Sequence, residues 1–178
     1  MDHAARQLAY FASIDHAERF RWQTEDAFVK TREHETLRPL IWLFRDLRIR
    51  LGRPLVVLES GCGEGVNMIH LRQLGLSEDD VVLNGIDLSA EAVAEAQHHG
   101  LMAQVGDGLA LPFADAIFDA VFCRDVLHHL ETDDDRRRFF FEMQRVLRPT
   151  GFVAAIEPND LNIMIFGLSI LISEERGL

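Results

Sequence analysis

Residues 56–67 read VVLESGCGEGVN. A short apolar run ends at an acidic residue, Glu59, and glycines then follow at every second position, at Gly61, Gly63 and Gly65. This pattern is typical of a buried strand that enters a glycine-rich turn and then a helix, and such turns often bind a phosphate group. The stretch therefore predicts a strand, a tight turn and a helix, and it raises the question of which ligand the turn binds.

The rest of the chain alternates between strand and helix patterns. Short apolar runs predict five strands, at 55–59, 81–87, 101–107, 116–123 and 151–157. Strands that alternate with helices indicate an α/β fold, in which a Rossmann-like, doubly wound and mostly parallel sheet has helices on both faces. Ligands bind such sheets at the carboxyl ends of the strands, so the residues that follow each strand are the most informative ones.

The helices are predicted from periodicity and from capping residues. One helix is expected over 66–75 and a second from the N-cap Ser89 to Gly100. A third is expected to start at Thr132 with three aspartates at its positive end and to run to Leu147, followed by a turn over 148–151. Apolar residues in the first fifty positions recur at three- and four-residue steps. We therefore expect two or three helices ahead of the sheet.

Composition limits the class of protein. The chain has 178 residues, 48% hydrophobic and 26% charged, as expected for one soluble domain. Its formal net charge of −11 disfavours binding to nucleic acid or to an anionic membrane surface, because both are polyanions. Cys62 and Cys123 form no metal-ligand or disulfide pattern, so a reduced, cytoplasmic protein is expected. The longest apolar stretch, 161–172, is too short to span a bilayer as a helix.

The glycine turn does not suit a phosphate ligand. In the dinucleotide fingerprint G-x-G-x-x-G, Gly61 and Gly63 fit, but Val66 stands where the third glycine belongs. No lysine follows the glycines to bind a phosphate. An ionised Glu59 beside a pyrophosphate would be repulsive, and more so in a site without water. The turn therefore favours a ligand with positive charge, such as a sulfonium or an ammonium group.

Acidic residues also end the next two strands. Asp87 follows Glu59 by 28 positions and could accept two hydrogen bonds from a ribose diol. Asp107 could accept a hydrogen bond from an exocyclic amine, with Gly108 leaving room for a flat ring. Three acidic residues at three successive strand ends indicate a nucleoside ligand that carries a cationic tail.

Four segments together resemble a known family. They read VLESGCGEG, GIDLS, GDGLALPFADAIFDAVFCRDVLHHL and LRPTGFVAAIEP, and they lie within residues 54–158. They resemble the motifs of the class I S-adenosylmethionine-dependent methyltransferases, in particular the small-molecule group that includes the ubiquinone and menaquinone biosynthesis enzymes. The resemblance implies S-adenosylmethionine as cofactor and S-adenosylhomocysteine as product.

The resemblance also implies roles for individual residues. Asp87 would bind the ribose, Leu88 would lie against the adenine, and Asp107 with Gly108 would bind the adenine amine. The methionine end would lie among Glu59, Ser60, Gly61, Cys62, Gly63 and Gly65, with Cys123 and Arg124 near its amino group. Residues 1–53 would form a helical cap over the substrate pocket, 54–158 the cofactor-binding core, and 159–178 an apolar tail of the same domain.

Candidates for catalysis are few. His128 and His129 follow the fourth predicted strand, where a substrate would approach, and either could take a proton from a hydroxyl group. A turn histidine that only packs or caps is the alternative. Asp119 lies inside the predicted strand 116–123 and is expected to be structural, bonding the backbone near the first motif. No four-ligand set for zinc is visible, so no metal site is predicted.

These observations predict a methyltransferase. The expected reaction is an in-line displacement onto an oxygen, carbon or nitrogen of a small-molecule acceptor, with the protein supplying alignment. One alternative is a module or truncated fragment that binds the cofactor without turnover. Another is a nicotinamide-dependent oxidoreductase, against which Glu59 and Val66 argue. A nucleic-acid acceptor is disfavoured by the net charge.

The C-terminal part departs from the family. Such enzymes continue past the fifth strand with two more strands, the last of them antiparallel, and residues 159–178 are too few to supply both. We expect this tail to be helical and the C-terminal strands of the family to be missing. An exposed edge at the fifth strand would favour pairing, so a homodimer through the C-terminal edge, or a fragment, is expected rather than a monomer.

Overall fold

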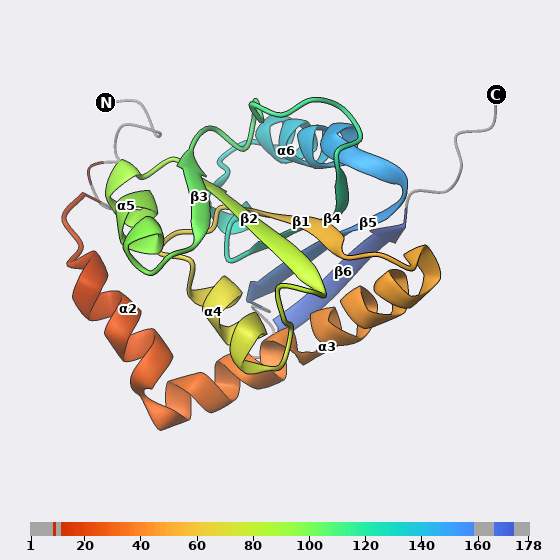
Figure 1. Cartoon of the computed structure of the whole chain (residues 1–178). Helices are drawn as coiled ribbons and strands as arrows, with labels where there is room; N and C mark the ends of the chain where they lie inside the picture. The colour runs from red at the N-terminus through yellow and green to blue at the C-terminus, as the bar shows by residue number, and fades with distance from the viewer. Residues whose placement is uncertain (1–8, 10–11, 159–165, 173–178) are drawn as a thin grey trace.

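The computed structural model describes residues 9, 12–158 and 166–172, and they form one sheet flanked by helices (Figure 1). The sheet has six strands in the order β3-β2-β1-β4-β5-β6. The first five run parallel, and β6 pairs antiparallel with β5. The strands are β1 (Leu55–Ser60), β2 (Val81–Asp87), β3 (Met102–Val105), β4 (Phe118–Arg124), β5 (Leu147–Pro158) and β6 (Phe166–Ile172). The predicted fold class is therefore confirmed.

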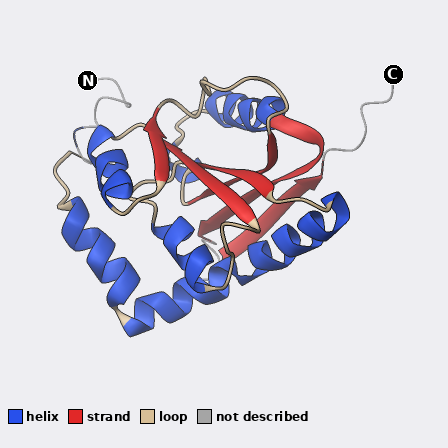
Figure 2. Ribbon diagram, viewed as in Figure 1, coloured by secondary structure: helices blue, strands red, loops and turns tan. Residues whose placement is uncertain are grey.

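Helices cover both faces of the sheet (Figure 2). One apolar core lies between the sheet and helices α3 and α4, and a second lies between the sheet and α6. Alternate residues of β1, β4 and β5 supply the two cores, as the period of a strand requires. The helical elements are α2 (His16–Glu25), α3 (Ala27–Leu51), α4 (Val66–Gln73), α5 (Ala90–His98), the 3₁₀ turn η1 (Leu127–His129) and α6 (Asp133–Val146).

Capping side chains define where the helices begin. Ser89 accepts a hydrogen bond from the Ala92 amide at the start of α5, as predicted, and Thr132 accepts one from the Asp135 amide at the predicted start of α6. Asp26 caps α3 by accepting from two amides of its first turn. Because Asp26 also ends α2, the chain turns sharply there, and the two N-terminal helices lie along different sides of the molecule (Figure 1).

Asp119 joins three segments of the sheet. Its carboxylate is 1% exposed and accepts hydrogen bonds from the Val56 amide of β1 at 2.8 Å and from both Arg53 terminal nitrogens at 2.6 and 2.7 Å. Arg148 on β5 forms an ion pair with it at 2.8 Å. Burial alone would raise the pKa of Asp119, but these partners outweigh burial and lower it. The predicted structural role of Asp119 is confirmed.

Strand β5 begins earlier than predicted. The expected turn over 148–151 is wrong, because β5 starts at Leu147 and contains an irregularity there. Phe118 pairs with Leu147 while Ala120 pairs with Phe152, so the extra residues bulge out of the ladder. A Cβ atom on Gly151 would lie 2.4 Å from the Asp119 carbonyl oxygen, which explains the glycine at this crowded position.

The C-terminal part also differs from the prediction. Residues 166–172 form a strand and not a helix, because their backbone pairs with β5 along seven positions from Phe152↔Ile172 to Pro158↔Phe166. The β5 edge on which the homodimer prediction rested is therefore covered by β6. One antiparallel strand of the kind expected to be missing is present. The remainder of the predicted tail, 159–165 and 173–178, lies outside the described residues.

Replacing Asp119 with asparagine should destabilise the fold. Asp119→Asn removes the charge that faces Arg53 and Arg148 and turns one acceptor into a donor. Because hydrogen bonds to charged groups contribute roughly 1.5 to 3 kcal/mol, we expect a loss of that order in the free energy of unfolding by urea denaturation. Asp79→Asn, at an exposed aspartate, is the matched control and should change little. Equal stability of the two variants would contradict the role of Asp119.

Candidate functional site

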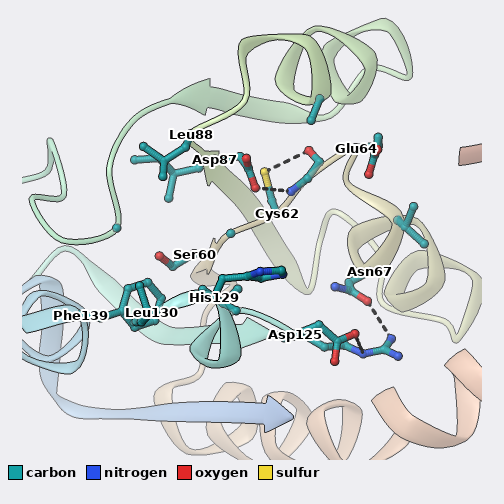
Figure 3. Close-up of a pocket in the computed structure, with 18 of the residues that line it drawn as sticks. Ser60, Cys62, Glu64, Asn67, Asp87, Leu88, Asp125, His129, Leu130 and Phe139 are labelled. Carbon is teal, nitrogen blue, oxygen red and sulfur yellow. Dashed lines mark hydrogen bonds and ion pairs between the residues drawn. The ribbon is translucent and has the colours of Figure 1, made fainter. Parts of the chain in front are cut away.

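A cavity of about 540 Å³ opens at the carboxyl ends of β1, β2 and β4 (Figure 3). It lies where the strand order reverses between β1 and β4, which is where open α/β sheets bind ligands. Ten of the predicted site residues line it: Ser60, Gly61, Cys62, Gly63, Asp87, Leu88, Asp107, Gly108, Arg124 and His129. Glu59, Gly65, Cys123 and His128 are not among the lining residues.

The glycine turn is bonded to the end of β2. The amides of Gly61 and Cys62 donate to the Ile86 carbonyl at 2.8 and 3.0 Å, and the Gly63 amide donates to Asp87 Oδ2 at 2.8 Å. Gly61 and Gly63 have φ angles of +81° and +51°, a region that glycine adopts without strain. A Cβ on Gly61 would lie 2.4 Å from Val126 Cγ2, whereas a Cβ on Gly63 would meet nothing within 4 Å. Gly63 therefore leaves open space on the cavity side of the turn.

Gly65 has a different function in the turn. It is the N-cap residue of α4, with a φ of +79°, and a Cβ there would lie 2.2 Å from Leu101 Cδ1. Glycine is needed here because the turn packs closely against Leu101. Gly65 thus contacts Leu101 and does not line the cavity.

Asp87 lies at the centre of the predicted nucleoside end. Its two oxygens accept hydrogen bonds from the Gly63 amide at 2.8 Å and the Ser89 amide at 2.9 Å. Burial raises the pKa of Asp87, and the two amides oppose this shift. A carboxylate has about four lone-pair sites, so two can still accept from a ligand. Leu88 follows directly and is 45% exposed beside the cavity.

Asp107 and Gly108 form a second part of the wall. Asp107 Oδ1 accepts from the Leu109 amide at 2.8 Å, which holds the turn after β3. A Cβ on Gly108 would lie 2.5 Å from the Phe139 ring of α6, so glycine lets this turn approach the ring closely. Asp107 therefore holds the turn and lines the cavity at the same time.

Glu59 does not line the cavity itself, but its hydrogen-bond partner Asn67 does. Glu59 is fully buried, and its Oε1 accepts from Asn67 Nδ2 at 2.5 Å while Oε2 has no hydrogen-bond partner. Asn67 Oδ1 in turn accepts from Arg124 at 3.0 Å, and Arg124 forms a buried ion pair with Glu33 of α3. Burial raises the pKa of Glu59 to about 8, although the Asn67 hydrogen bond and the Arg124 charge both lower it.

Cys123 does not reach the cavity. Its side chain is fully buried in the core between the sheet and α6, and burial raises the pKa of its thiol well above the usual value. The cavity is lined instead by residues that follow Cys123 in the chain, beginning with Arg124 and Asp125.

The two candidate histidines lie in different places. His128 Nδ1 bonds Glu157 Oε2 at 2.8 Å, outside the cavity lining, and Glu157 Oε1 accepts from the Val126 and Leu127 amides. His129 lines the cavity, and Figure 3 shows its ring between Ser60 and Asn67. Of the two, only His129 is positioned to contact a molecule in the cavity.

Several lining residues gave no signal in the sequence. His16 of α2 and Glu33 of α3 reach the cavity from the N-terminal helices, and Glu64 reaches it from the glycine turn. Asp125 has a φ of +55°, unusual for a residue other than glycine, and its buried Oδ1 has no hydrogen-bond partner. Strain of this kind is concentrated at functional sites, but no local sequence pattern reports it.

Comparisons with known proteins define the family. The model of the methyltransferase domain family matches residues 58–155, so the chain belongs to this family. A 27-O-demethylrifamycin SV methyltransferase of Amycolatopsis mediterranei (strain S699) is 33% identical over 141 residues, which are 75% of this chain and 47% of that protein. A tRNA (carboxymethyluridine(34)-5-O)-methyltransferase of Arabidopsis thaliana is 32% identical over 113 residues, which are 61% of this chain and 26% of that protein.

A solved structure supports the fold. The PH0226 protein from Pyrococcus horikoshii OT3 has a TM-score of 0.60 and 24% identity, and the match covers 84% of this chain and 66% of that one. The family match and the relatives confirm the resemblance to the class I S-adenosylmethionine-dependent methyltransferases, a family whose cofactor is S-adenosylmethionine. The chain spans less than half of the length of the two curated relatives.

The residues present fit this cofactor. Gly63 leaves space on the cavity side, and Asp87 has lone pairs to spare for a diol. The buried Ser60 Oγ lines the cavity and has no hydrogen-bond partner, so a polar ligand group would satisfy it. Within the part of the chain that the structure describes, no group of three or more His, Cys, Asp or Glu side chains could hold a metal ion. No helix among the described residues could cross a membrane.

Gly61→Ala should destabilise the protein more than Gly63→Ala. Both variants place an L-residue in the left-handed region, at a cost of about 1 to 2 kcal/mol. Only the first also forces a methyl group against Val126. In urea denaturation, adding Val126→Ala to Gly61→Ala should recover part of the loss, because the two positions are in contact. Equal losses at the two glycines, or no recovery, would contradict this geometry.

Glu59→Gln should change how stability depends on pH. An acid whose folded pKa is raised binds more protons in the folded state, so stability falls as pH rises from the unfolded pKa of about 4.3 toward the folded value of about 8. The variant lacks this effect. Its melting temperature should therefore exceed that of the wild type at about pH 8.5, and the difference should shrink toward about pH 5.5. A difference that does not vary with pH would contradict the raised pKa.

Proposed function

We propose that this chain carries an S-adenosylmethionine-dependent methyltransferase activity toward a small-molecule acceptor. The observation that supports it best is the convergence of the glycine turn, Asp87 and the Asp107–Gly108 turn on one cavity at the strand-order reversal. Because the chain spans less than half of the two curated relatives, their activities and acceptors are not carried over.

The predicted roles of the cofactor-binding residues remain proposals. Asp87 would accept from the ribose hydroxyls, Leu88 would pack against the adenine, and Asp107 would accept from the adenine amine. Gly63 would leave room for the methionine end. Glu59 would act on the cationic tail through Asn67, because its own side chain is buried beneath the cavity.

The proposed reaction is an in-line methyl transfer. When bound, the cofactor supplies a methyl group activated by a positively charged sulfur, and the protein aligns the acceptor with it. Of the two candidate bases, His129 is the one we retain, because it lines the cavity while His128 is held by Glu157. His129 would take the proton that the acceptor loses.

A small acceptor without negative charge fits the electrostatics. The cavity wall near His129 includes Asp125, Glu131 and Asp135, and the whole chain carries a formal net charge of −11. Acidic walls repel the phosphates of an RNA acceptor. By their names, the two relatives act on 27-O-demethylrifamycin SV and on tRNA, so the choice between a small molecule and RNA as the acceptor rests on charge.

Calorimetric titration with S-adenosylhomocysteine tests the proposal. We expect saturable binding by the wild type and a loss of roughly ten- to a hundredfold in affinity for Asp87→Ala, because hydrogen bonds to a charged group are lost. NADH should not bind. Asp79→Asn is the matched surface control, and a thermal melt of each variant shows that it is folded.

The outcomes separate the alternatives. No binding by the folded wild type, or binding of NADH instead, would overturn the proposal. Binding without transfer of a labelled methyl group to any of a panel of amines, hydroxyl compounds and tRNA would identify a module without turnover. Transfer to tRNA alone would overturn the small-molecule acceptor. With an acceptor in hand, His129→Gln should slow transfer and leave S-adenosylhomocysteine affinity unchanged.

A further inference from the structure

A buried pair joins helix α2 to the glycine turn. His16, the first residue of α2, bonds Glu64 Oε1 through Nδ1 at 2.5 Å, and the two residues are 8% and 3% exposed. Arg19, one turn further along α2, lies 3.7 Å from the same oxygen. Glu64 stands between Gly63 and Gly65, so the pair connects the N-terminal helices to the turn that forms the cofactor site.

The second ring nitrogen of His16 has no partner. His16 Nε2 is buried without a hydrogen bond, and His16 lines the cavity together with Glu64, Gly63 and Asp87. An unsatisfied buried nitrogen costs roughly 1 to 3 kcal/mol, so such atoms usually have a partner in the functional state. The position of His16 in the cavity wall indicates that the missing partner is a group of the ligand.

The surroundings limit what that group can be. A carboxylate only accepts, so the bond to Glu64 keeps a proton on His16 Nδ1. Nε2 is then an acceptor when the ring is neutral and a donor when it is charged. A hydroxyl group suits both states, because it donates and accepts. An anionic group would lie near two carboxylates, those of Glu64 and Asp87, and would be repelled.

The position of Asp87 indicates which hydroxyl group of the ligand His16 Nε2 would contact. Asp87 and Glu64 both line the cavity (Figure 3). The Gly63 amide, next to Glu64 in the chain, donates to Asp87. A sugar diol bound by Asp87 would therefore lie beside the His16–Glu64 pair.

We propose that His16 binds a ribose hydroxyl of the cofactor through Nε2, so that α2 forms one wall of the cofactor site. This inference rests on the proposed function. It assigns to the N-terminal helices a part in cofactor binding, in addition to any contact with the acceptor. The alternative is that the His16–Glu64 pair only fastens α2 to the core.

His16→Asn separates the two roles. Asparagine can place an amide nitrogen near the position of histidine Nδ1 and keep the bond to Glu64, but it has nothing at the position of Nε2. We expect the unliganded variant to melt close to the wild type and to bind S-adenosylhomocysteine roughly three- to tenfold more weakly, as for the loss of one hydrogen bond. His98→Asn, at an exposed histidine, is the matched control and should bind like the wild type.

A pair of ligands identifies the atom that His16 contacts. We would titrate both proteins with 5′-methylthioadenosine and with its 2′,3′-dideoxy counterpart. The variant should lose the same three- to tenfold with the first ligand and nothing with the second, since a coupling energy appears only when both partners are present.

Three results would overturn the proposal. If His16→Asn binds S-adenosylhomocysteine as tightly as the wild type, the His16–Glu64 pair only attaches α2 to the core. Equal losses with both nucleosides would place the contact away from the ribose. A loss with S-adenosylhomocysteine but not with methylthioadenosine would place it on the amino-acid part. These results all require a wild type that binds S-adenosylhomocysteine, whereas failure of the wild type to bind would overturn the proposed function as well.

Discussion

The hydrogen bonds between the glycine turn and the end of β2 are the interaction on which the site depends. The amides of Gly61 and Cys62 share the Ile86 carbonyl, and the Gly63 amide bonds Asp87. Gly61 and Gly63 have positive φ angles in this turn, a region that glycine adopts without strain. The hydrogen bonds hold the ends of two neighbouring strands in one geometry, so that the open side of Gly63 and the remaining lone pairs of Asp87 face the same cavity. Every proposed contact with the cofactor starts from this arrangement.

A buried network connects this turn to the N-terminal helices. It runs from Glu59 through Asn67 and Arg124 to Glu33 on α3. Burial would raise the pKa of Glu33, but its bonds to Arg124 and Arg32 outweigh burial and lower it, whereas burial prevails at Glu59. Glu59, near the turn, therefore lacks enough positive partners to offset its burial, whereas Glu33 on α3 has them. A cationic ligand beside Asn67 would supply what Glu59 lacks, which agrees with a cofactor that carries a positive tail.

The N-terminal helices belong to the site in a physical sense. α2 contributes His16, which bonds Glu64 of the glycine turn, and α3 contributes Glu33, which forms a buried ion pair with Arg124 of β4. Buried pairs of this kind contribute less to stability than to a unique arrangement, because desolvation offsets their attraction. Their position around the cavity indicates that the helices are held in place for binding.

The sequence alone determined the local elements and the type of ligand. The apolar run predicted β2 at its observed bounds, and Ser89 was found as a cap and Thr132 as a helix start. The acidic residues at three strand ends indicated a nucleoside with a cationic tail. These features depend on neighbours in the chain. Tertiary structure decided the rest: the burial of Glu59 behind Asn67, the separation of His129 from His128, the β5 irregularity and the antiparallel β6. It also paired His16 with Glu64, 48 positions apart, because contacts between distant residues follow from how the elements pack and leave no local pattern.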